Sequence, residues 1–132
     1  MSTAAADRRH LEDLVVRFTE AFNRDDLDEV MSFVADDAIY DEYNGARHHG
    51  REAIRAAFVP QFRGDFGTIR FLTEDLFVDV DTGKALIRWE CRLTRGDTTR
   101  AWRGLDVLRF EGDRLREKHT YAKAHAPLLT PR

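Results

Sequence analysis

The chain has 132 residues, of which 42% are hydrophobic and 34% charged, a composition typical of one folded domain over residues 1–132 and not of a disordered chain. Its formal net charge is −3, and 21 basic residues are scattered among 24 acidic ones, so we expect no nucleic-acid partner. No apolar run is long enough to cross a bilayer, and the single cysteine, Cys91, fits a reducing cytoplasm.

Three helices are predicted in the first half of the chain. Apolar residues recur at helical spacing in LEDLVVRFTEAF, which predicts an amphipathic helix over about residues 7–23. Asp25 is the expected cap of a second, shorter helix. Gly50 opens a third helix, in which Pro60 limits the regular length. Between the last two helices we expect a short strand and a polar loop, over residues 38–42 and 44–49.

The second half of the chain is predicted to form antiparallel strands. Residues 68–79 are rich in Ile, Phe, Leu and Val and lead into a turn at Asp81-Thr82-Gly83. In the following strand, the run IRWECRL alternates apolar with charged side chains. A hairpin over residues 102–121 closes the strand region. Helices followed by antiparallel strands predict an α+β fold, with the helices packed on one side of a curved sheet.

Asp106 lies in the middle of the most apolar strand, where an aspartate is unfavourable and costly to bury without a partner. Alternation places it on one strand face with Trp102, and Tyr40 with Glu42 on one face of the early strand. Of two carboxyls in an apolar cavity, one can stay protonated as a donor while the other acts as base. The alternative is that Asp106 bonds to Lys118 or to backbone amides and only fixes the strand.

His48 and His49 follow Asp41 and Glu42 closely enough to suggest a metal site. Adjacent loop residues rarely converge on one ion, however, and no second His or Cys cluster has ligand spacing. We therefore expect no metal and a solvated loop at the mouth of a pocket. One histidine of this loop can act as a general acid or base, and His49 is taken as the ligand contact.

Three stretches together resemble the nuclear transport factor 2-like superfamily, which includes SnoaL-like polyketide cyclases and Δ5-3-ketosteroid isomerases. They are FTEAFNRDDLDEVMSFVADDAIY, GREAIRAAF and GLDVLRFEGDRL, in the superfamily's order. The resemblance implies a cystatin-like cone, in which a bent antiparallel sheet wraps around the long first helix and leaves an apolar pocket at the wide end. It also implies a homodimer through the outer sheet face, where Leu105, Val107 and Tyr121 would form an apolar patch.

The resemblance also implies roles for single residues. The general base of the isomerases falls at Glu42, and their protonated oxyanion-hole aspartic acid falls at Asp106. Their oxyanion-hole tyrosine falls at Phe18, which lacks the phenol, so Tyr40 is the candidate to assist. In limonene epoxide hydrolase-like relatives, the Arg-x-Asp pair loses its arginine here and the second aspartate falls at Thr120, which largely breaks that mechanism.

The walls of the implied pocket are less sharply defined. The resemblance turns Lys118 and Thr120 toward it, whereas polarity alone favours burial of Tyr121. Lys118 would be a polar anchor for a ligand or an ordinary cross-strand ion pair. Phe18, Trp89 and Trp102 are taken as ligand contacts in the pocket wall, and the alternative for each is a place in the core.

Two functions remain open from the sequence. The first is a cofactor-independent acid–base enzyme of isomerase, cyclase or dehydratase type that acts on a small, mostly apolar carbonyl compound, with Asp106 and Glu42 central. The second is a non-catalytic domain that binds a small apolar molecule or serves as a dimeric accessory module. Two carboxyls within reach of one bound atom would favour the enzyme, and an Asp106 locked to Lys118 would favour the binding domain.

Overall fold

The structure, a computed structural model, describes residues 3–123, with side chains from Asp7 onward. Within this span the helices are α1 (Thr3–Asn23), α2 (Leu27–Ser32) and α3 (Arg51–Arg63). The strands are β1 (Val34–Asp41), β2 (Arg47–His49), β3 (Thr68–Asp79), β4 (Lys84–Arg95), β5 (Thr98–Glu111) and β6 (Arg114–Ala122).

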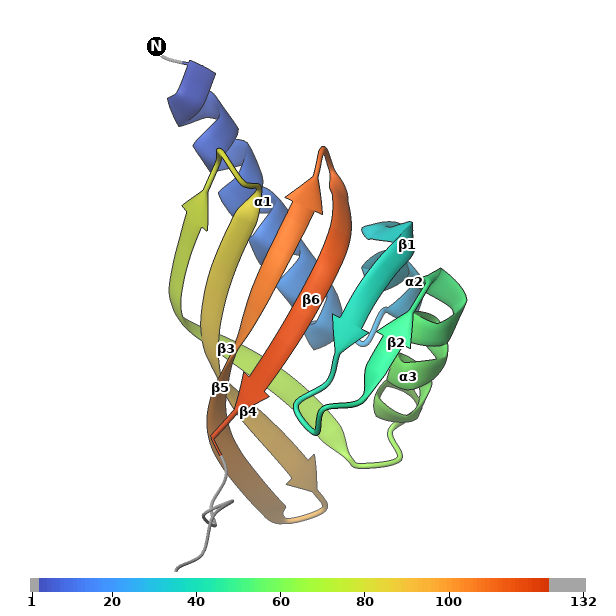
Figure 1. Ribbon diagram of the computed structural model, residues 1–132. Helices are drawn as coiled ribbons and strands as arrows, with labels where there is room; N and C mark the ends of the chain where they lie inside the picture. Colours follow the sequence, from blue (N-terminus) through green and yellow to red (C-terminus); the bar gives the residue numbers. More distant parts are fainter. Residues whose placement is uncertain (1–2, 124–132) are drawn as a thin grey trace, which may run out of the picture.

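The six strands form one curved sheet in the order β2-β1-β6-β5-β4-β3. The long helix α1 crosses one face of this sheet, and α3 lies beside β1 and β2 (Figure 1). The predicted α+β fold with an N-terminal helix against a bent sheet is therefore confirmed. Neighbouring strands are antiparallel, as predicted, except that β1 and β6 run parallel. This pair joins the first strand of the chain to the last one, and no local sequence pattern reveals it.

The ends of two helices differ from the prediction. Asp26, rather than Asp25, caps α2, because its carboxylate accepts a hydrogen bond of 3.0 Å from the backbone N–H of Glu29. Asp25 instead has a φ of 55°, in the left-handed region. Pro60 does not end α3, which continues to Arg63 and closes at Gly64, whose φ is 85°.

The early strand region is also more extensive than predicted. β1 begins at Val34, four residues before the predicted start, and three residues of the expected polar loop form β2. β2 pairs antiparallel with β1, so that Tyr40 lies opposite His48 and Ile39 opposite His49. This short strand decides which of the two histidines faces inward.

The core lies between the inner face of the sheet and the three helices. Ile87, Trp89 and Cys91 are buried on alternate positions of β4, as the sequence pattern predicted. Burial raises the pKa of the Cys91 thiol to about 12, so the thiol is unreactive at neutral pH. Aromatic rings fill the space between α1, α3 and β3: Phe22 packs against Phe58, Phe62 and Phe71, with ring centroids 5.3, 5.5 and 6.0 Å away.

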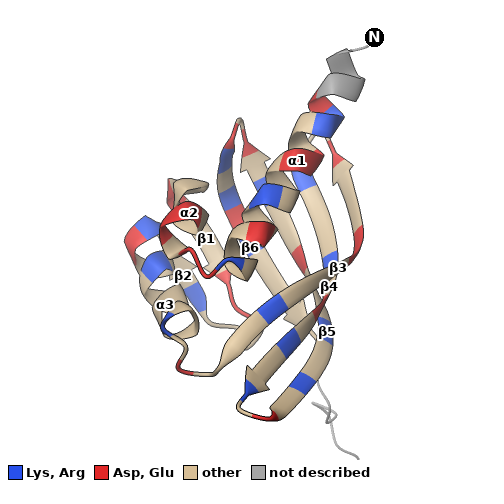
Figure 2. Cartoon of the chain, turned by 180° about the vertical axis from the view of Figure 1, so that it is seen from behind, with Lys and Arg blue, Asp and Glu red and all other residues tan. Residues whose placement is uncertain are grey.

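Charges of both signs are interspersed along the helices and strands (Figure 2). Several join elements that are distant in the sequence: Arg70 pairs with Asp25, and Arg55 of α3 pairs with Asp28 of α2. Such exposed pairs contribute little stability each. In the described part of the chain, no helix has the length and apolar character that a membrane span requires.

Candidate functional site

Polar side chains form one block on the inner face of the sheet, made up of Tyr40, Asp106, Lys118 and Thr120. The register places Tyr40 of β1 beside Lys118 of β6, and Thr120 of β6 beside Asp106 of β5. In a strand, positions two apart share a face, so Lys118 and Thr120 both turn inward. Tyr121 is 60% exposed on the outer side. The face of β6 that turns inward is therefore the one that the resemblance implied. The burial of Tyr121 that polarity alone favoured is not observed.

Asp106 is buried, and each of its two oxygens accepts a hydrogen bond. Oδ1 lies 2.8 Å from Nζ of Lys118 and 2.6 Å from Oγ1 of Thr120, while Oδ2 lies 3.1 Å from Nε1 of Trp89. All three partners donate to Asp106, an arrangement that suits the carboxylate anion. The structure thus contains the Asp106–Lys118 pair that the sequence left as an alternative.

Gly104 makes the position of Trp89 possible. A Cβ on Gly104 would lie 2.5 Å from the outer edge of the Trp89 ring and 2.4 Å from the carbonyl oxygen of Tyr121. Glycine in mid-strand therefore lets the indole lie across β5 and reach Asp106. The Arg-x-Asp pair of the epoxide hydrolase-like pattern would place a large side chain at this position.

Lys118 is a buried cation with several partners. Besides Asp106, its Nζ donates to Oγ1 of Thr120 at 2.8 Å and lies 4.8 Å from the ring centroid of Tyr40. Burial alone would lower the pKa of Lys118, but the attraction of the Asp106 carboxylate and the hydrogen bond to it outweigh this effect. The net pKa lies above its ordinary value, so the ammonium form is stable at neutral pH.

Tyr40 extends this block toward β2 and α3. Its ring centroid lies 4.9 Å from that of Phe58 and 5.7 Å from that of His48. Burial is the largest influence on Tyr40 and raises the pKa of its phenol, against an opposing effect of Lys118. The phenol is therefore neutral at physiological pH and can donate a hydrogen bond.

Glu42 follows β1 directly and pairs with His48. Its Oε2 lies 2.7 Å from Nε2 of His48, and the two side chains are 26% and 25% exposed. His49, the histidine named from the sequence, is exposed and lies on the opposite side of β2. The sequence left open which of the two histidines could be an acid or base; the structure places His48 against Glu42, and the distinguishing signal is its pairing with Tyr40 in a strand that was taken as a loop.

The two candidate carboxylates are held by different partners. Asp106 is bound by Lys118, Thr120 and Trp89, whereas Glu42 is bound by His48. The structure therefore does not bring them together as a carboxyl pair around one space. In the described residues, no buried side-chain nitrogen or oxygen is left without a hydrogen-bond partner.

A cavity of about 300 Å³ opens where β1 and β6 end. Glu42 and Thr120 belong to its lining, which also includes Asp41, Tyr43, Gly45, Arg47, His119 and Tyr121. Because the Thr120 hydroxyl bonds to both Asp106 and Lys118, it links this cavity to the buried pair. Asp41, Arg47, His119 and Tyr121 belong to the outer side of the sheet, so this cavity opens at the strand ends and is not the predicted apolar interior of the cone.

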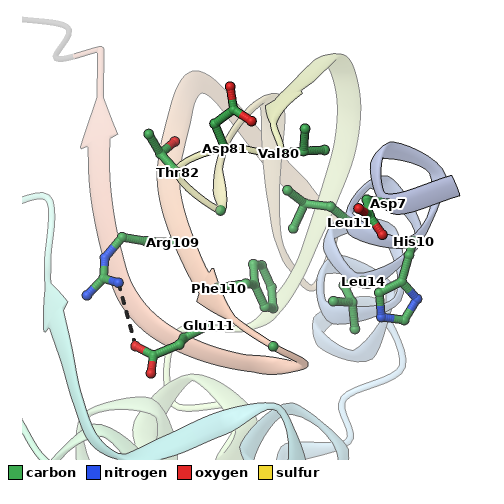
Figure 3. Close-up of a pocket in the computed structure, with 12 residues that line it drawn as sticks. Asp7, His10, Leu11, Leu14, Val80, Asp81, Thr82, Arg109, Phe110 and Glu111 are labelled. Atoms are coloured by element: carbon green, nitrogen blue, oxygen red, sulfur yellow. Dashed lines mark ion pairs between the residues drawn. The ribbon is translucent and has the colours of Figure 1, made fainter. Parts of the chain in front are cut away.

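A second cavity, of about 380 Å³, lies between the start of α1 and two turns of the sheet (Figure 3). Its lining includes Leu11, Leu14, Asp81 and Phe110, but none of the site residues predicted from the sequence. We therefore leave it aside as a candidate active site.

The three aromatic residues predicted as ligand contacts lie outside the lining of both cavities. Phe18 is 2% exposed and packs edge-on against Phe22, with ring centroids 5.2 Å apart. Trp89 is buried beside Asp106, and Trp102 is half-buried against the core. Among residues 3–123, no group of three or more His, Cys, Asp or Glu side chains could hold a metal ion.

The outer face of the same strands carries a line of ion pairs. Asp41 accepts hydrogen bonds from Arg47, at 2.6 and 2.9 Å, and lies 2.8 Å from Nδ1 of His119. The other ring nitrogen of His119 lies 3.0 Å from Glu117, which also pairs with Arg109. The hydrogen bond from Arg47, with a smaller one from His119, lowers the pKa of Asp41 to about 2.

This network predicts a specific acid sensitivity. Because the pKa of Asp41 is lower in the folded chain, its contribution to stability is present above pH 3.8 and is lost as the pH falls toward 2. Asp41→Asn should be less stable than wild type at pH 7 and should lose less stability between pH 4 and pH 2, measured by urea unfolding. Asp97→Asn, at an exposed turn, is the control; an equal pH dependence in Asp41→Asn and wild type would contradict the prediction.

The buried pair predicts a non-additive mutational effect. Lys118→Met should lower the free energy of unfolding by about 3–5 kcal/mol, because it leaves the Asp106 carboxylate buried without its counter-charge. The double variant Lys118→Met/Asp106→Asn should lose less than Lys118→Met alone, since no unpaired charge remains. Chemical unfolding at pH 7 measures both, and a double variant less stable than Lys118→Met would refute this account.

Comparison with solved structures agrees with this architecture. The chain superposes with a TM-score of 0.76 on a protein from Xanthomonas campestris assigned as a polyketide cyclase, at 20% identity over 89% of this chain and 93% of that one. An NTF2-like protein of unknown function from Mesorhizobium loti gives 0.73, at 24% identity over 89% and 93%. The epoxide hydrolase/cyclase-like enzyme SalBIII, of salinomycin pyran ring formation, gives 0.77, at 14% identity over 87% and 92%.

These identities are low enough to show a shared fold and no more. No curated protein matches the chain. The family model described as the SnoaL-like domain, however, matches residues 15–118, which is well over half of the sequence. The chain therefore belongs to the family of SnoaL-like domains.

Proposed function

We propose that this SnoaL-like domain is a cofactor-independent acid–base enzyme of isomerase, cyclase or dehydratase type. Its substrate would be a small, mostly apolar carbonyl compound bound where β1 and β6 end. The observation that carries the proposal is the cavity there, which is lined by both Glu42 and Thr120. A carboxylate with a histidine partner and a hydroxyl backed by a buried ammonium thus border one space.

The chemistry follows from these two sides of the cavity. Removal of a proton next to a carbonyl leaves an electron pair that moves to the carbonyl oxygen, which becomes an enolate oxygen. Hydrogen-bond donors at that oxygen stabilise the developing charge. The Thr120 hydroxyl already gives its hydrogen to Asp106, so the neutral phenol of Tyr40 would be the donor, and the Lys118 ammonium beside it provides positive charge. The acid–base group would come from the Glu42 end.

The role of Asp106 changes in this proposal. The sequence suggested a protonated donor, whereas its contacts in the structure support a carboxylate that orients Lys118 and Thr120. Asp106 would then be a positioning residue, and Tyr40 with the charge of Lys118 would replace the phenol that Phe18 lacks. Fixed, pre-oriented donors of this kind lose little energy to reorganisation during a reaction.

A second candidate, a non-catalytic domain that binds a small apolar molecule, is favoured by one observation. Every polar atom of Asp106 is satisfied within the protein, mainly by Lys118 and Thr120, so the block is stable without any reaction. Under this alternative the cavity would still bind ligands, and Glu42 would only hold the loop through His48. We propose the cytoplasm as the compartment in either case, with the buried Cys91 reduced.

Deuterium exchange tests the enzymatic proposal without knowledge of the natural substrate. Wild-type protein in D₂O should accelerate exchange of the α-hydrogens of 2-tetralone, followed by proton NMR, and Glu42→Gln should reduce the acceleration by about 10²–10⁴-fold. Glu52→Gln, on the exposed first turn of α3, is the matched control. If 2-tetralone binds but exchanges no faster than in buffer, the enzymatic proposal fails for this substrate class and the binding domain takes its place.

We also propose a homodimer through the outer sheet face. Leu105 and Val107 are half-buried on that face, and Tyr121, opposite Leu105, is 60% exposed. Phe77 adds a 59% exposed ring on β3. Apolar side chains grouped on one face are better explained by a partner than by water.

The dimer is tested by mass in solution. Light scattering at micromolar concentration should give twice the mass of one chain for wild type and a single-chain mass for Val107→Glu, because the substitution places a charge in the patch. A single-chain mass for wild type would disprove the dimer.

A further inference from the structure

A series of ion pairs with alternating charge runs across β2, β1, β6 and β5. Each member contacts the next, with N···O distances of 4.0 Å or less. The members, in order, are Arg47, Asp41, His119, Glu117, Arg109, Glu111, Arg116 and Asp37. Histidine is the side chain that ordinarily gains and loses a proton between pH 5 and pH 8, so His119 is the member that can interrupt the series in that range.

Both ring nitrogens of His119 contact carboxylates. Nδ1 lies 2.8 Å from Oδ2 of Asp41, and Nε2 lies 3.0 Å from Oε1 of Glu117. A carboxylate only accepts hydrogen bonds, so both contacts are hydrogen bonds only when each nitrogen carries a hydrogen, as in the imidazolium. In the neutral ring one nitrogen has a lone pair, which repels the carboxylate oxygen that it faces.

The other partners of the two carboxylates decide which contact the neutral ring keeps. Arg47 donates to both oxygens of Asp41. Arg109 bonds to Oε2 of Glu117 and leaves Oε1 to His119. The pKa of Glu117 is lowered chiefly by the hydrogen bond from His119, and the pKa of Asp41 chiefly by the bond from Arg47. Neutral His119 should therefore keep its hydrogen on Nε2, bonded to Glu117, and lose the bond to Asp41.

The bond that is lost joins β1 to β6 at the end where the cavity of Glu42 and Thr120 opens. Asp41 is the last residue of β1 and precedes Glu42, whose backbone N–H bonds to Ala46 across the turn into β2. Glu42 therefore moves with β1 and β2, whereas Thr120 follows His119 in β6. Because Asp41 and His119 both line this cavity, their bond holds its two sides together.

The charged and titratable groups that face His119 come from four strands. They are Asp41 of β1, Arg47 of β2, Arg109 of β5, and Glu117 and Tyr121 of β6. The residue opposite His119 in β5 is the apolar Val107. A phenol is ordinarily neutral between pH 5 and pH 8, and carboxylates and guanidinium groups keep their charges there. The change in charge over this range therefore falls on His119.

We propose that protonated His119 is a positioning residue of the cavity, and that loss of its proton near neutral pH loosens the pairing of β1 with β6 at the cavity end; we call this change the His119 switch. Each carboxylate keeps an arginine partner after the change, so the protein stays folded in both forms. The effect on ligand binding rests on the proposed function: the cavity would bind its ligand more tightly at pH 5 than at pH 8.

Two measurements without ligand test the His119 switch. Nitrogen-15 NMR of the histidine rings should show hydrogen on both nitrogens of His119 at pH 5 and on Nε2 alone at pH 8. Amide hydrogen exchange should show residues 39–42 equally protected in wild type and His119→Arg at pH 5, and about 2–5-fold less protected in wild type at pH 8, the effect of one cross-strand pair. Arginine keeps its charge at both pH values and has donors for both carboxylates.

Two further variants complete the comparison. His119→Gln, which is never charged, should resemble wild type at pH 8 at both pH values. His49→Gln is the matched control, because it removes an exposed histidine of β2 that lies outside the ion-pair series; it should keep the wild-type pH dependence. Binding of 2-tetralone should be equal in wild type and His119→Arg at pH 5 and about 2–5-fold weaker in wild type at pH 8.

The outcomes separate this inference from the function on which it rests. A single ring hydrogen on His119 at pH 5, or equal protection of residues 39–42 in wild type and His119→Arg at pH 8, overturns the His119 switch. If the switch is observed but both proteins bind 2-tetralone equally at pH 8, the positioning role is wrong and the proposed function stands. Absence of 2-tetralone binding to wild type at both pH values removes the proposed function and the positioning role, while the measurements without ligand still decide the switch.

Discussion

The buried ion pair between Asp106 and Lys118 is the constraint around which the inner face of the sheet is arranged. Two charges are costly to remove from water, and their attraction repays this cost only when their remaining hydrogen-bonding capacity is also satisfied. Thr120 and Trp89 complete the hydrogen bonds of Asp106, and the face of Tyr40 lies beside Lys118. Each of these side chains is therefore held in place by its contact with one of the two buried charges.

The contacts of this ion pair depend on features elsewhere in the sheet. Trp89 can reach Asp106 only because β5 has a glycine where the indole crosses it. Tyr40 is beside Lys118 only because β1 pairs in parallel with β6, strands that lie more than seventy positions apart in the chain. The parallel pair in an otherwise antiparallel sheet is thus the feature that brings the early strand to the charged centre.

The block divides into a fixed part and an accessible part. Asp106 and Lys118 are buried and paired, and the pKa of Lys118 is raised, so the ammonium is a fixed positive charge at neutral pH. Glu42 is partly exposed and lines the cavity at the end of the sheet, with His48 bound to it. A fixed charge beside an accessible proton acceptor is an arrangement that acid–base chemistry can use, and one that a ligand-binding domain could use for orientation.

The sequence by itself determined the α+β fold and the faces of β4 and β5, because both depend on local periodicity and on the order of motifs along the chain. The alternation in β4 and the position of Asp106 on the inner face are examples. Only the tertiary structure decided what Asp106 bonds to, since Lys118, Thr120 and Trp89 reach it from two neighbouring strands. It also decided that His48 rather than His49 faces inward, because a three-residue strand has too few residues to show a period and takes its register from β1.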